Sequence, residues 1–441
     1  MKKLVVLGGG ESGVGSAILG QRKGFEVFLS DSSRLTAKYA DMLTREGIHF
    51  EEGGHTMERI LEADLVIKSP GIPDKVAVIK ALREAGKEII SEIEFAGRYT
   101  SARTLCITGS NGKTTTTTLT HKILEDAGFN VGLGGNIGKS FALSVATEDK
   151  DWYVLELSSF QLDGMFDFRA DISVLMNITP DHLDRYNYKF EDYAASKMRI
   201  ARNQTSEQKF VFMADDKNIS SRLDAHAAEV TRLPFSKDMV GEDGIIRLSL
   251  GDKELEINSN KLQIKGLHNM YNAMAASLAA MAAGVPAESI LSSLYSFEGV
   301  EHRLEPAGVV DGVEYINDSK ATNVDSVWYA LGSMTRPTIW IAGGTDKGND
   351  YEPLKELVYE KVKALVCMGL NNERLVESFR GVVPVYPTNS LDEAMKVCRS
   401  VAKEGYTVLL SPACASFDLF KNYEDRGRQF KEYVKKIQNN G

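Results

Sequence analysis

Short apolar runs alternate with stretches of helical periodicity along most of this chain. In the first segment the apolar runs cover residues 4–7, 27–29 and 65–67. Each run leads into a polar turn that contains glycine, and then into a helical stretch. Buried parallel strands connected by helices produce this pattern. The first segment is therefore predicted to form a parallel, doubly wound sheet.

The same alternation continues in two further segments. Four runs predict a second, larger sheet, at residues 105–108, 152–157, 172–176 and 210–213. Four more predict a third, at residues 313–316, 338–341, 364–368 and 407–410. An Ala- and Met-rich stretch at 270–283 and the charged C-terminal tail predict helices. The fold class is α/β, with predicted domains at 1–95, 96–299 and 300–441.

Residues 236–266 follow a different pattern. The short runs GIIRLSL, KELEI and KLQI alternate polar and apolar positions, and Gly-Asp and Asn-Ser-Asn separate them. Alternation with a period of two, broken by such turns, is typical of antiparallel hairpins. We expect a small antiparallel addition to the second domain.

Composition narrows the class of protein. The chain has 441 residues, of which 43% are hydrophobic and 26% are charged. These fractions are typical of soluble globular proteins. Its net charge of −9 provides no basic surface for nucleic acid. No apolar run approaches the ~18 residues of a membrane span. The start, MKKLVVLGGGESG, is interpreted as a first strand and not as a signal peptide. Four cysteines without metal-ligand spacing are expected to be buried, reduced thiols of a cytoplasmic protein: Cys106, Cys367, Cys398 and Cys414.

The strongest motif is RTLCITGSNGKTTTTTLTHKIL, residues 103–124. A buried strand, a glycine turn, Lys113 and the start of a helix make the layout of a phosphate-binding loop. Glycines let backbone N–H groups face oxyanions, and Lys113 and the helix dipole add positive charge. Thr114 places a hydroxyl where a phosphate-bound Mg²⁺ would lie. The strict pattern requires glycine where Ile107 stands, so the loop is shorter than the common form. The alternative is a strand–helix turn that merely contains glycine and lysine.

A second glycine motif, GGGESG at residues 8–13, matches G-x-G-x-x-G. Asp31 ends the next predicted strand, and together they resemble a dinucleotide fingerprint. The alternative is a tight turn with Asp31 as a helix N-cap. Ser69, Pro70 and Gly71 follow a third strand, at the carboxyl edge where such sheets bind ligands.

Further polar groups follow predicted strands of the second domain. Glu156 is either a second Mg²⁺ contact or a solvent-facing strand end. His182, in NITPDHLD, is either a metal ligand or a structural histidine. Asn269 and Asn272 lie at the start of the predicted Ala-rich helix. They either hold the base or ribose of a nucleotide or only cap the helix. Lys197 would usually be a solvated helix lysine.

Three strand ends of the third domain carry polar groups. The sequences are NDSKATN from Asn317, GGTDK from Gly343 and SPACASF from Ser411. In a parallel sheet these ends lie at one edge, which suits a ligand that carries carboxylates. The alternative is that each is only a turn.

Nine motifs occur in order: TGSNGKTTTT, GGNIG, ELSSFQL, NITPDHLDRY, GLHNMYNAMAA, EHRLE, NDSKATN, AGGTDKG and LSPACASFDLFKNYEDRG. Together they resemble the Mur ligases across essentially the whole chain. The resemblance implies a Rossmann-like N-terminal domain for a uridine nucleotide, a central ATPase and a Rossmann-like C-terminal domain. The D-N-P-R motif of the members that add a diamino acid is replaced here by DKGND. Together with the short SPACASFD segment, this favours D-glutamate.

The resemblance also implies site residues. ATP would contact Gly109, Ser110, Asn111, Gly112, Lys113, Thr114, Thr115, Asn269, Asn272, Arg303 and Asp318. The catalytic residues would be Lys113, Glu156, His182 and Lys197, and the metal ligands Thr114, Glu156, His182 and a carbamylated Lys197. The UDP-substrate would contact Glu11, Ser12, Asp31, Ser32, Gly71, Asn136 and His182. D-Glutamate would contact Thr322, Lys347, Ser416 and Phe417.

The activity implied is ATP-driven amide ligation in the cytoplasmic synthesis of peptidoglycan precursors. D-Glutamate would be added to UDP-N-acetylmuramoyl-L-alanine through an acyl phosphate, with release of ADP and phosphate. Two Mg²⁺ ions, which Mn²⁺ could replace, and a carbamate formed from CO₂ on Lys197 would assist. The protein would be a monomer that binds small molecules, without nucleic acid or a membrane span.

Three alternatives remain at this point. One is another Mur-type or folylpolyglutamate-type ligase with a different amino acid. The second is a nicotinamide-dependent dehydrogenase, which rests on residues 8–13 and Asp31 and leaves the Lys113 loop unexplained. The third is a nucleotide-switch protein, which rests on that loop alone.

Overall fold

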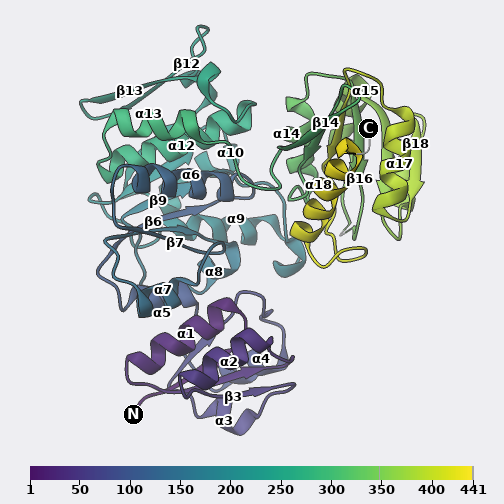
Figure 1. The fold of residues 1–441 in the computed structure, drawn as a ribbon. Helices are drawn as coiled ribbons and strands as arrows, with labels where there is room; N and C mark the ends of the chain where they lie inside the picture. The colour runs from purple at the N-terminus through teal and green to yellow at the C-terminus, as the bar shows by residue number, and fades with distance from the viewer. Residues whose placement is uncertain (347, 440–441) are drawn as a thin grey trace. The chain divides into compact units, whose positions relative to one another are not determined.

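The computed structural model describes residues 1–346 and 348–439 and contains three large sheets and one hairpin (Figure 1). It divides into two compact units. The first comprises Met1–Leu262 and Met270–Phe297, and the second comprises Gln263–Asn269 and the chain from Glu298 onward. Among the helices described, none is both long and apolar enough to cross a membrane.

The first sheet is entirely parallel, in the order β3-β2-β1-β4-β5. Its strands are β1 (Lys3–Leu7), β2 (Glu26–Asp31), β3 (His49–Glu52), β4 (Leu65–Lys68) and β5 (Ile89–Ile90). Its helices are α1 (Glu11–Arg22), α2 (Ala37–Arg45), α3 (Met57–Leu61) and α4 (Ala77–Glu84), and α5 (Glu92–Gly97) follows. The predicted doubly wound sheet is confirmed. The edge strands β3 and β5 were not predicted, because one is half polar and the other has two residues.

The central sheet is also parallel, in the order β11-β10-β9-β6-β8-β7. Its strands are β6 (Arg103–Thr108), β7 (Val131–Gly135), β8 (Trp152–Glu156), β9 (Ile172–Leu175), β10 (Lys209–Met213) and β11 (Thr231–Phe235). The chain builds β7 and β8 on one side of β6 and then β9 to β11 on the other. Loops after β6, β8 and β9 therefore meet at a reversal of strand order, where open α/β sheets bind ligands.

Eight helices of the described chain accompany the central sheet and belong to the first unit, except for residues 267–269 at the start of the Ala-rich helix, which belong to the second. They are α6 (Lys113–Asp126), α7 (Phe141–Thr147), α8 (Ser159–Asp163), α9 (Phe190–Met198), α10 (Lys217–Ser220), α11 (Leu223–His226), α12 (Leu267–Ala283) and α13 (Ala287–Ser296). Helix α6 packs on β8 and β7 and against α13. The predicted Ala-rich helix is confirmed as α12, whose alanines are mostly buried.

The small antiparallel addition is one hairpin, β12 (Ile245–Leu250) and β13 (Lys253–Asn258), with the predicted Gly-Asp turn. The prediction of a further strand in KLQI is wrong. The Asn258 side chain accepts a hydrogen bond from Asn260 N and begins the short 3₁₀ helix Ser259–Lys261. The chain leaves the hairpin there, so the alternating pattern that follows has no partner strand.

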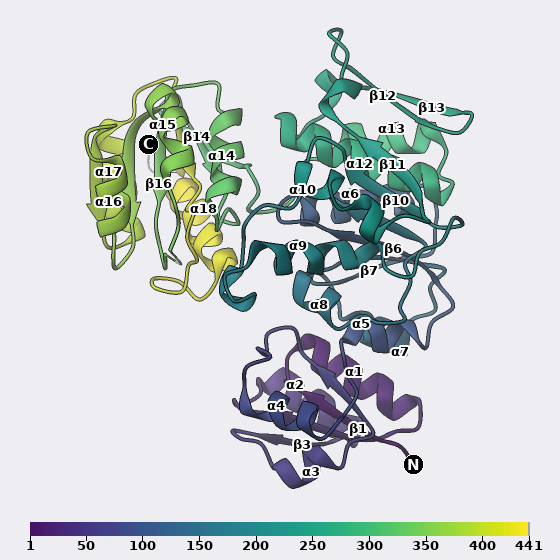
Figure 2. The ribbon, with the colours of Figure 1, turned by 180° about the vertical axis from the view of Figure 1, so that it is seen from behind.

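The third sheet has the order β14-β15-β19-β16-β17-β18, and only the β14–β15 pair is antiparallel. Figure 2 shows β14 and β16 of this sheet with the helices labelled α14 to α18 around them. Its strands are β14 (Glu305–Val310), β15 (Val313–Asn317), β16 (Thr338–Ala342), β17 (Val362–Met368), β18 (Val385–Thr388) and β19 (Thr407–Leu410). Its helices are α14 (Val324–Ser333), α15 (Lys355–Lys361), α16 (Glu373–Phe379), α17 (Leu391–Val401) and α18 (Tyr423–Asn439). The amphipathic C-terminal helix is confirmed, with Phe430, Val434 and Ile437 buried.

The predicted domain ranges stay a prediction, because the first compact unit contains both of the first two sheets. The predicted limit after residue 95 falls inside α5. All four cysteines are buried and free, as predicted.

Candidate active site

The glycine turn after β6 has the geometry that its sequence predicts. Gly109 and Gly112 have φ values of 154° and 82°. A Cβ on Gly109 would lie 2.8 Å from the Cβ of Met176, and one on Gly112 would lie 2.6 Å from Asn272 Oδ1. Both positions therefore require glycine. Helix α6 starts directly at Lys113, so its N-terminus and positive dipole end lie at the turn.

The turn is fastened to the segment that follows β9. Ser110 N donates to Asn177 O at 2.9 Å, and Asn111 N donates to Asn177 Oδ1 at 2.8 Å. Ser110 Oγ donates to Thr179 O at 2.8 Å. Within NITPDHLD the prediction concerned His182, and the role of Asn177 was missed. The available signal was a polar residue directly after a predicted strand.

Two lysines converge on one carbonyl of the turn. Lys113 Nζ donates to Gly109 O at 2.7 Å and to Ser110 O at 2.9 Å. Lys197 Nζ, from α9, donates to the same Gly109 O at 2.8 Å, and the Lys197 residue is only 2% exposed. Burial lowers the pKa of Lys197 well below its usual range, and the charge of Lys113 lowers it further. Burial in this fold therefore disfavours the charged form of the Lys197 side chain.

Glu156 ends β8 beside the turn and is 1% exposed. Its Oε1 accepts a hydrogen bond from Asn136 Nδ2 at 2.8 Å, whereas its Oε2 has no partner among the described residues. A buried carboxylate oxygen without a partner is costly unless a cation lies against it. Thr114, in the first turn of α6, is also buried. Carboxylate and hydroxyl oxygens are ligands that Mg²⁺ prefers, so these residues fit a magnesium site.

His182 lies in the loop after β9 with φ 51°, and its side chain is largely exposed. Its ring packs edge-on against Phe160 of α8, with 5.4 Å between the ring centroids. Arg185 stacks on the same Phe160 ring at 4.2 Å and donates to the carbonyls of Pro70 and Ile72 at 3.3 and 3.4 Å. The His182 loop is thereby connected to the loop after β4, which contains Gly71.

The glycine turn after β1 is hydrogen-bonded to a carboxylate of the protein itself. Asp31 Oδ2 accepts from Gly9 N at 2.6 Å, and Asp31 Oδ1 accepts from Ser33 N at 2.7 Å. A Cβ on Gly13 would lie 1.8 Å from Gly8 O, so close backbone packing requires that glycine. The interpretation of Asp31 as a helix N-cap is wrong, since Thr36 precedes α2.

The other residues assigned to the UDP-substrate lie around this turn or near β8. Ser12 is in the first turn of α1, and Ser32 is exposed just after β2. Glu11 Oε2 accepts from Tyr39 Oη at 2.7 Å. Asn136 is exposed, although its amide reaches Glu156.

In the second unit, the three polar strand ends meet around a buried arginine. Arg426 of α18 is 1% exposed, and burial lowers its pKa to about 10. Its guanidinium donates to Ser319 O, Cys414 O and Gly343 O at 2.9, 3.2 and 3.5 Å. The predicted common edge is confirmed. Arg426 itself was missed, although it precedes Phe430 by four residues and so lies on the buried face of the helix.

Asp318 lies on this edge and is 3% exposed. Its oxygens accept from Ser411 Oγ at 2.7 Å and Leu304 N at 3.3 Å. Burial raises its pKa to about 7, against the opposing charges of Arg303 and Arg426. Arg303 Nε is buried without a hydrogen bond to any described residue.

The remaining predicted residues divide between the units. Asn269 belongs to the second unit and donates to Lys265 O at 2.9 Å, whereas Asn272 belongs to the first and accepts from Thr116 Oγ1 at 3.2 Å. Ser416 is buried and Phe417 is 71% exposed. Thr322 is half-buried just before α14. The predicted D-glutamate contact Lys347 lies outside the described residues.

One other cluster has metal-ligand chemistry: Glu301, His302 and Glu305. The Lys431 ammonium lies 2.6 Å from Glu301 Oε1 and 2.8 Å from Glu305 Oε1. One ammonium group thus bridges both carboxylates, and the cluster is explained as a salt-bridge network.

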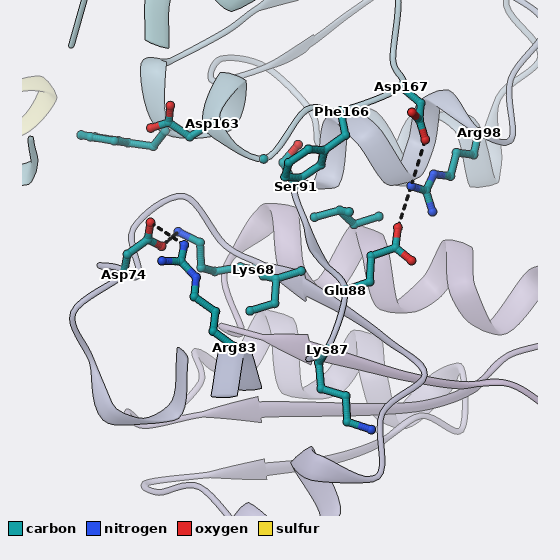
Figure 3. Close-up of a pocket in the computed structure, with 14 residues that line it drawn as sticks. Lys68, Asp74, Arg83, Lys87, Glu88, Ser91, Arg98, Asp163, Phe166 and Asp167 are labelled. Carbon is teal, nitrogen blue, oxygen red and sulfur yellow. Dashed lines mark hydrogen bonds and ion pairs between the residues drawn. The ribbon is translucent and has the colours of Figure 1, made fainter. Parts of the chain in front are cut away.

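A cavity of about 340 Å³ lies where residues after β4 face the α8 region (Figure 3). Figure 3 shows Asp74 paired with both Lys68 and Arg83, and Arg98 paired with both Glu88 and Asp167. These charges pair within the cavity wall. None of the lining residues belongs to the turn after β6, so this cavity is separate from the candidate nucleotide site.

Three family profiles match the chain in order. They are "MurD N-terminal domain" over residues 3–78, "Mur ligase middle domain" over 107–280 and "Mur ligase, glutamate ligase domain" over 302–414. Proteins named UDP-N-acetylmuramoylalanine--D-glutamate ligase are 55% identical in Bacteroides fragilis and 50% in Christiangramia forsetii, over 99% of this chain and 100% of theirs. The protein of that name from Chlorobaculum tepidum is 42% identical, over 98% of this chain and 97% of its own.

Solved structures share the fold at low identity. A pseudomurein peptide ligase type C from Methanothermus fervidus has a TM-score of 0.62 at 22% identity, covering 99% of this chain and 100% of its own. A UDP-N-acetylmuramate-alanine ligase from Thermotoga maritima has a TM-score of 0.62 at 19% identity, covering 99% of both chains. With the full-length identities, these matches establish that the chain belongs to the Mur ligase family.

Proposed function

We propose that this protein is an ATP-dependent amide ligase that adds D-glutamate to UDP-N-acetylmuramoyl-L-alanine during peptidoglycan precursor synthesis. The observation that carries this function is the 50–55% identity, over nearly the whole chain, to relatives that bear that activity in their names. The phosphate-binding turn at Gly109–Gly112 supports the ATP step. The dehydrogenase alternative is dropped, because the full-length relatives are named as ligases and a dehydrogenase leaves the Lys113 loop unexplained.

In the proposed reaction the L-alanine carboxylate attacks the γ-phosphorus of ATP, which forms a C–O–P acyl phosphate and releases ADP. The D-glutamate amine then attacks the acyl carbon, and the resulting tetrahedral intermediate expels phosphate and leaves an amide. Several anions must come together in both steps. Lys113 and the N-terminus of α6 would neutralise them by preorganised electrostatics. Asn269, Asn272, Arg303 and Asp318 are proposed to complete the ATP contacts.

Divalent magnesium, when bound, would neutralise phosphate charge and polarise the phosphoryl oxygens. Thr114, Glu156 and His182 are proposed to hold it, supported by the buried, unpartnered Oε2 of Glu156. Lys197 is proposed to complete the site as a carbamate. Its neutral amine would form an N–C bond to CO₂ and lose a proton to solvent, which converts a buried amine into an anionic oxygen ligand. The lowered pKa of Lys197 supports this step.

The substrate contacts are proposed from the family motifs. Glu11, Ser12, Asp31, Ser32, Gly71 and Asn136 would contact the UDP-substrate, and Thr322, Lys347, Ser416 and Phe417 would contact D-glutamate. The Asp31 carboxylate at the first glycine turn would accept hydrogen bonds from the hydroxyl and N–H donors of a uridine more favourably than it would face a bare phosphate. We also propose that the protein acts as a cytoplasmic monomer.

The direct test is phosphate release in the presence of ATP, Mg²⁺, UDP-N-acetylmuramoyl-L-alanine and each of a set of amino acids. Release that requires both the UDP-substrate and D-glutamate is expected. Release with a different amino acid would support another Mur-type or folylpolyglutamate-type ligase. Hydrolysis that needs neither substrate would support a nucleotide switch instead.

A further inference from the structure

The loop after β7 folds back onto the end of β8. The two strands pair in parallel, and Gly135 stands opposite Glu156. Gly135 has φ 94°, and a Cβ there would lie 2.2 Å from Glu156 O. Only glycine allows this approach, which brings Asn136 N to 2.8 Å from Glu156 O. The backbone thus sets Asn136 directly against the strand end that carries Glu156.

The Asn136 side chain then distinguishes the two oxygens of the Glu156 carboxylate. Its Nδ2 donates to Oε1 at 2.8 Å, while Oε2 is buried with no partner among the described residues. The amide must present Nδ2 and not Oδ1 to Oε1, because two acceptors would repel each other. One oxygen is therefore held, and the other is left for a cation.

We propose that Asn136 is a positioning residue for the divalent metal ion: it orients Glu156 so that Oε2 faces the ion. This inference rests on the proposed metal role of Glu156. It gives Asn136 a function beyond the contact with the UDP-substrate that the family motif implies. Its Nδ2 serves the carboxylate, and its Oδ1 remains for a donor on a substrate. Residues that hydrogen-bond a metal ligand typically change metal affinity by about 10–100-fold when removed.

The test measures metal binding without turnover. Mn²⁺ is titrated into the full-length protein with a non-hydrolysable ATP analogue, and free Mn²⁺ is followed by electron paramagnetic resonance. Asn136→Ala is expected to raise the Kd for Mn²⁺ about tenfold. Binding of the analogue in EDTA should not change. In turnover assays the Mg²⁺ concentration needed for half-maximal rate should rise in parallel.

The matched control is Asn130→Ala. Asn130 is exposed and immediately precedes the first residue of β7, whereas Asn136 follows the last. The side-chain amide of Asn130 donates to Asp149 O at 2.9 Å. This variant should bind Mn²⁺ as the parent does. If Asn136→Ala also binds Mn²⁺ normally and only the KM for the UDP-substrate rises, Asn136 is a substrate contact and the proposal is overturned.

A Glu156→Gln variant separates this inference from the function on which it rests. Weak Mn²⁺ binding in Glu156→Gln together with normal binding in Asn136→Ala would overturn the positioning role alone. Normal Mn²⁺ binding in both variants would remove Glu156 from the metal site and the inference with it. Loss of binding in both supports the proposal.

Discussion

The two glycine turns of the first unit, after β1 and after β6, differ in the charge around them. In the first, the Asp31 carboxylate accepts the Gly9 N–H. In the second, the Nζ atoms of Lys113 and Lys197 both donate to the Gly109 carbonyl. Both turns precede a helix N-terminus, which by itself favours an anion. The side chains therefore distinguish the two turns: a carboxylate accepts from the first, and two lysine side chains donate to the second.

The largest effect is expected at Lys197, whose buried amine donates a hydrogen bond to the second turn. Lys197→Ala should lose at least about 10³-fold in kcat, because the proposed carbamate ligand disappears. Acetate or another small carboxylic acid should restore part of the activity, measured as phosphate release. Lys113→Ala should gain nothing from acetate and serves as the control. A fully active Lys197→Ala protein would remove carbamylation from the mechanism.

Removing the charge of Lys113 tests directly whether the second turn binds the reacting phosphates. Lys113→Ala should reduce kcat about 10²–10³-fold, since it removes a preorganised cation from the transferring phosphate. Lys122→Ala is the control on the same helix, because Lys122 pairs with Asp126 at 2.8 Å away from the turn. Near-normal turnover by Lys113→Ala would show that the loop does not hold the reacting phosphates.

Asp318, like Asp31, is an acid at the end of a strand, but its side chain is buried. Its folded pKa, about 7, lies above its usual value of 3.8, so the folded protein binds the proton more tightly than the unfolded chain. Folding stability should therefore fall as pH rises from about 4 to 7. Asp318→Asn removes this dependence, so the Tm difference between variant and parent should increase as pH rises from about 4 to 7, reflecting on the order of a few kcal/mol. A Tm difference independent of pH would mean that Asp318 does not titrate in this range.

The smallest effect is expected at the first turn. Asp31→Asn weakens the hydrogen bond from Gly9 N and should raise the KM for the UDP-substrate about tenfold, with the KM for ATP unchanged. Asp64→Asn is the matched control, because Asp64 accepts from Lys3 N at 2.8 Å in the same sheet. A rise in the KM for ATP instead would place the nucleotide triphosphate near the first turn.

Much of the fold could be predicted because buried parallel strands leave continuous apolar runs. The strands that were missed lack that signal: β7 reads VGLGG and β11 contains Pro234 at the edge of its sheet. The strand predicted in KLQI had the right alternation but no partner. Pairing depends on where the chain goes next, which a local pattern does not contain.

The sequence by itself determined the glycine turn after β6, because the glycine positions, Lys113 and the strand before them are neighbours in the chain. Only the tertiary structure decided what Lys197, Asn136 and Arg426 do. Burial and the charge of Lys113, 84 positions away, lower the pKa of Lys197. The amide of Asn136 acts on a carboxylate of another strand, and Arg426 joins three separate strand ends. A side chain's pKa and hydrogen bonds depend on neighbours in space, and folding supplies those neighbours.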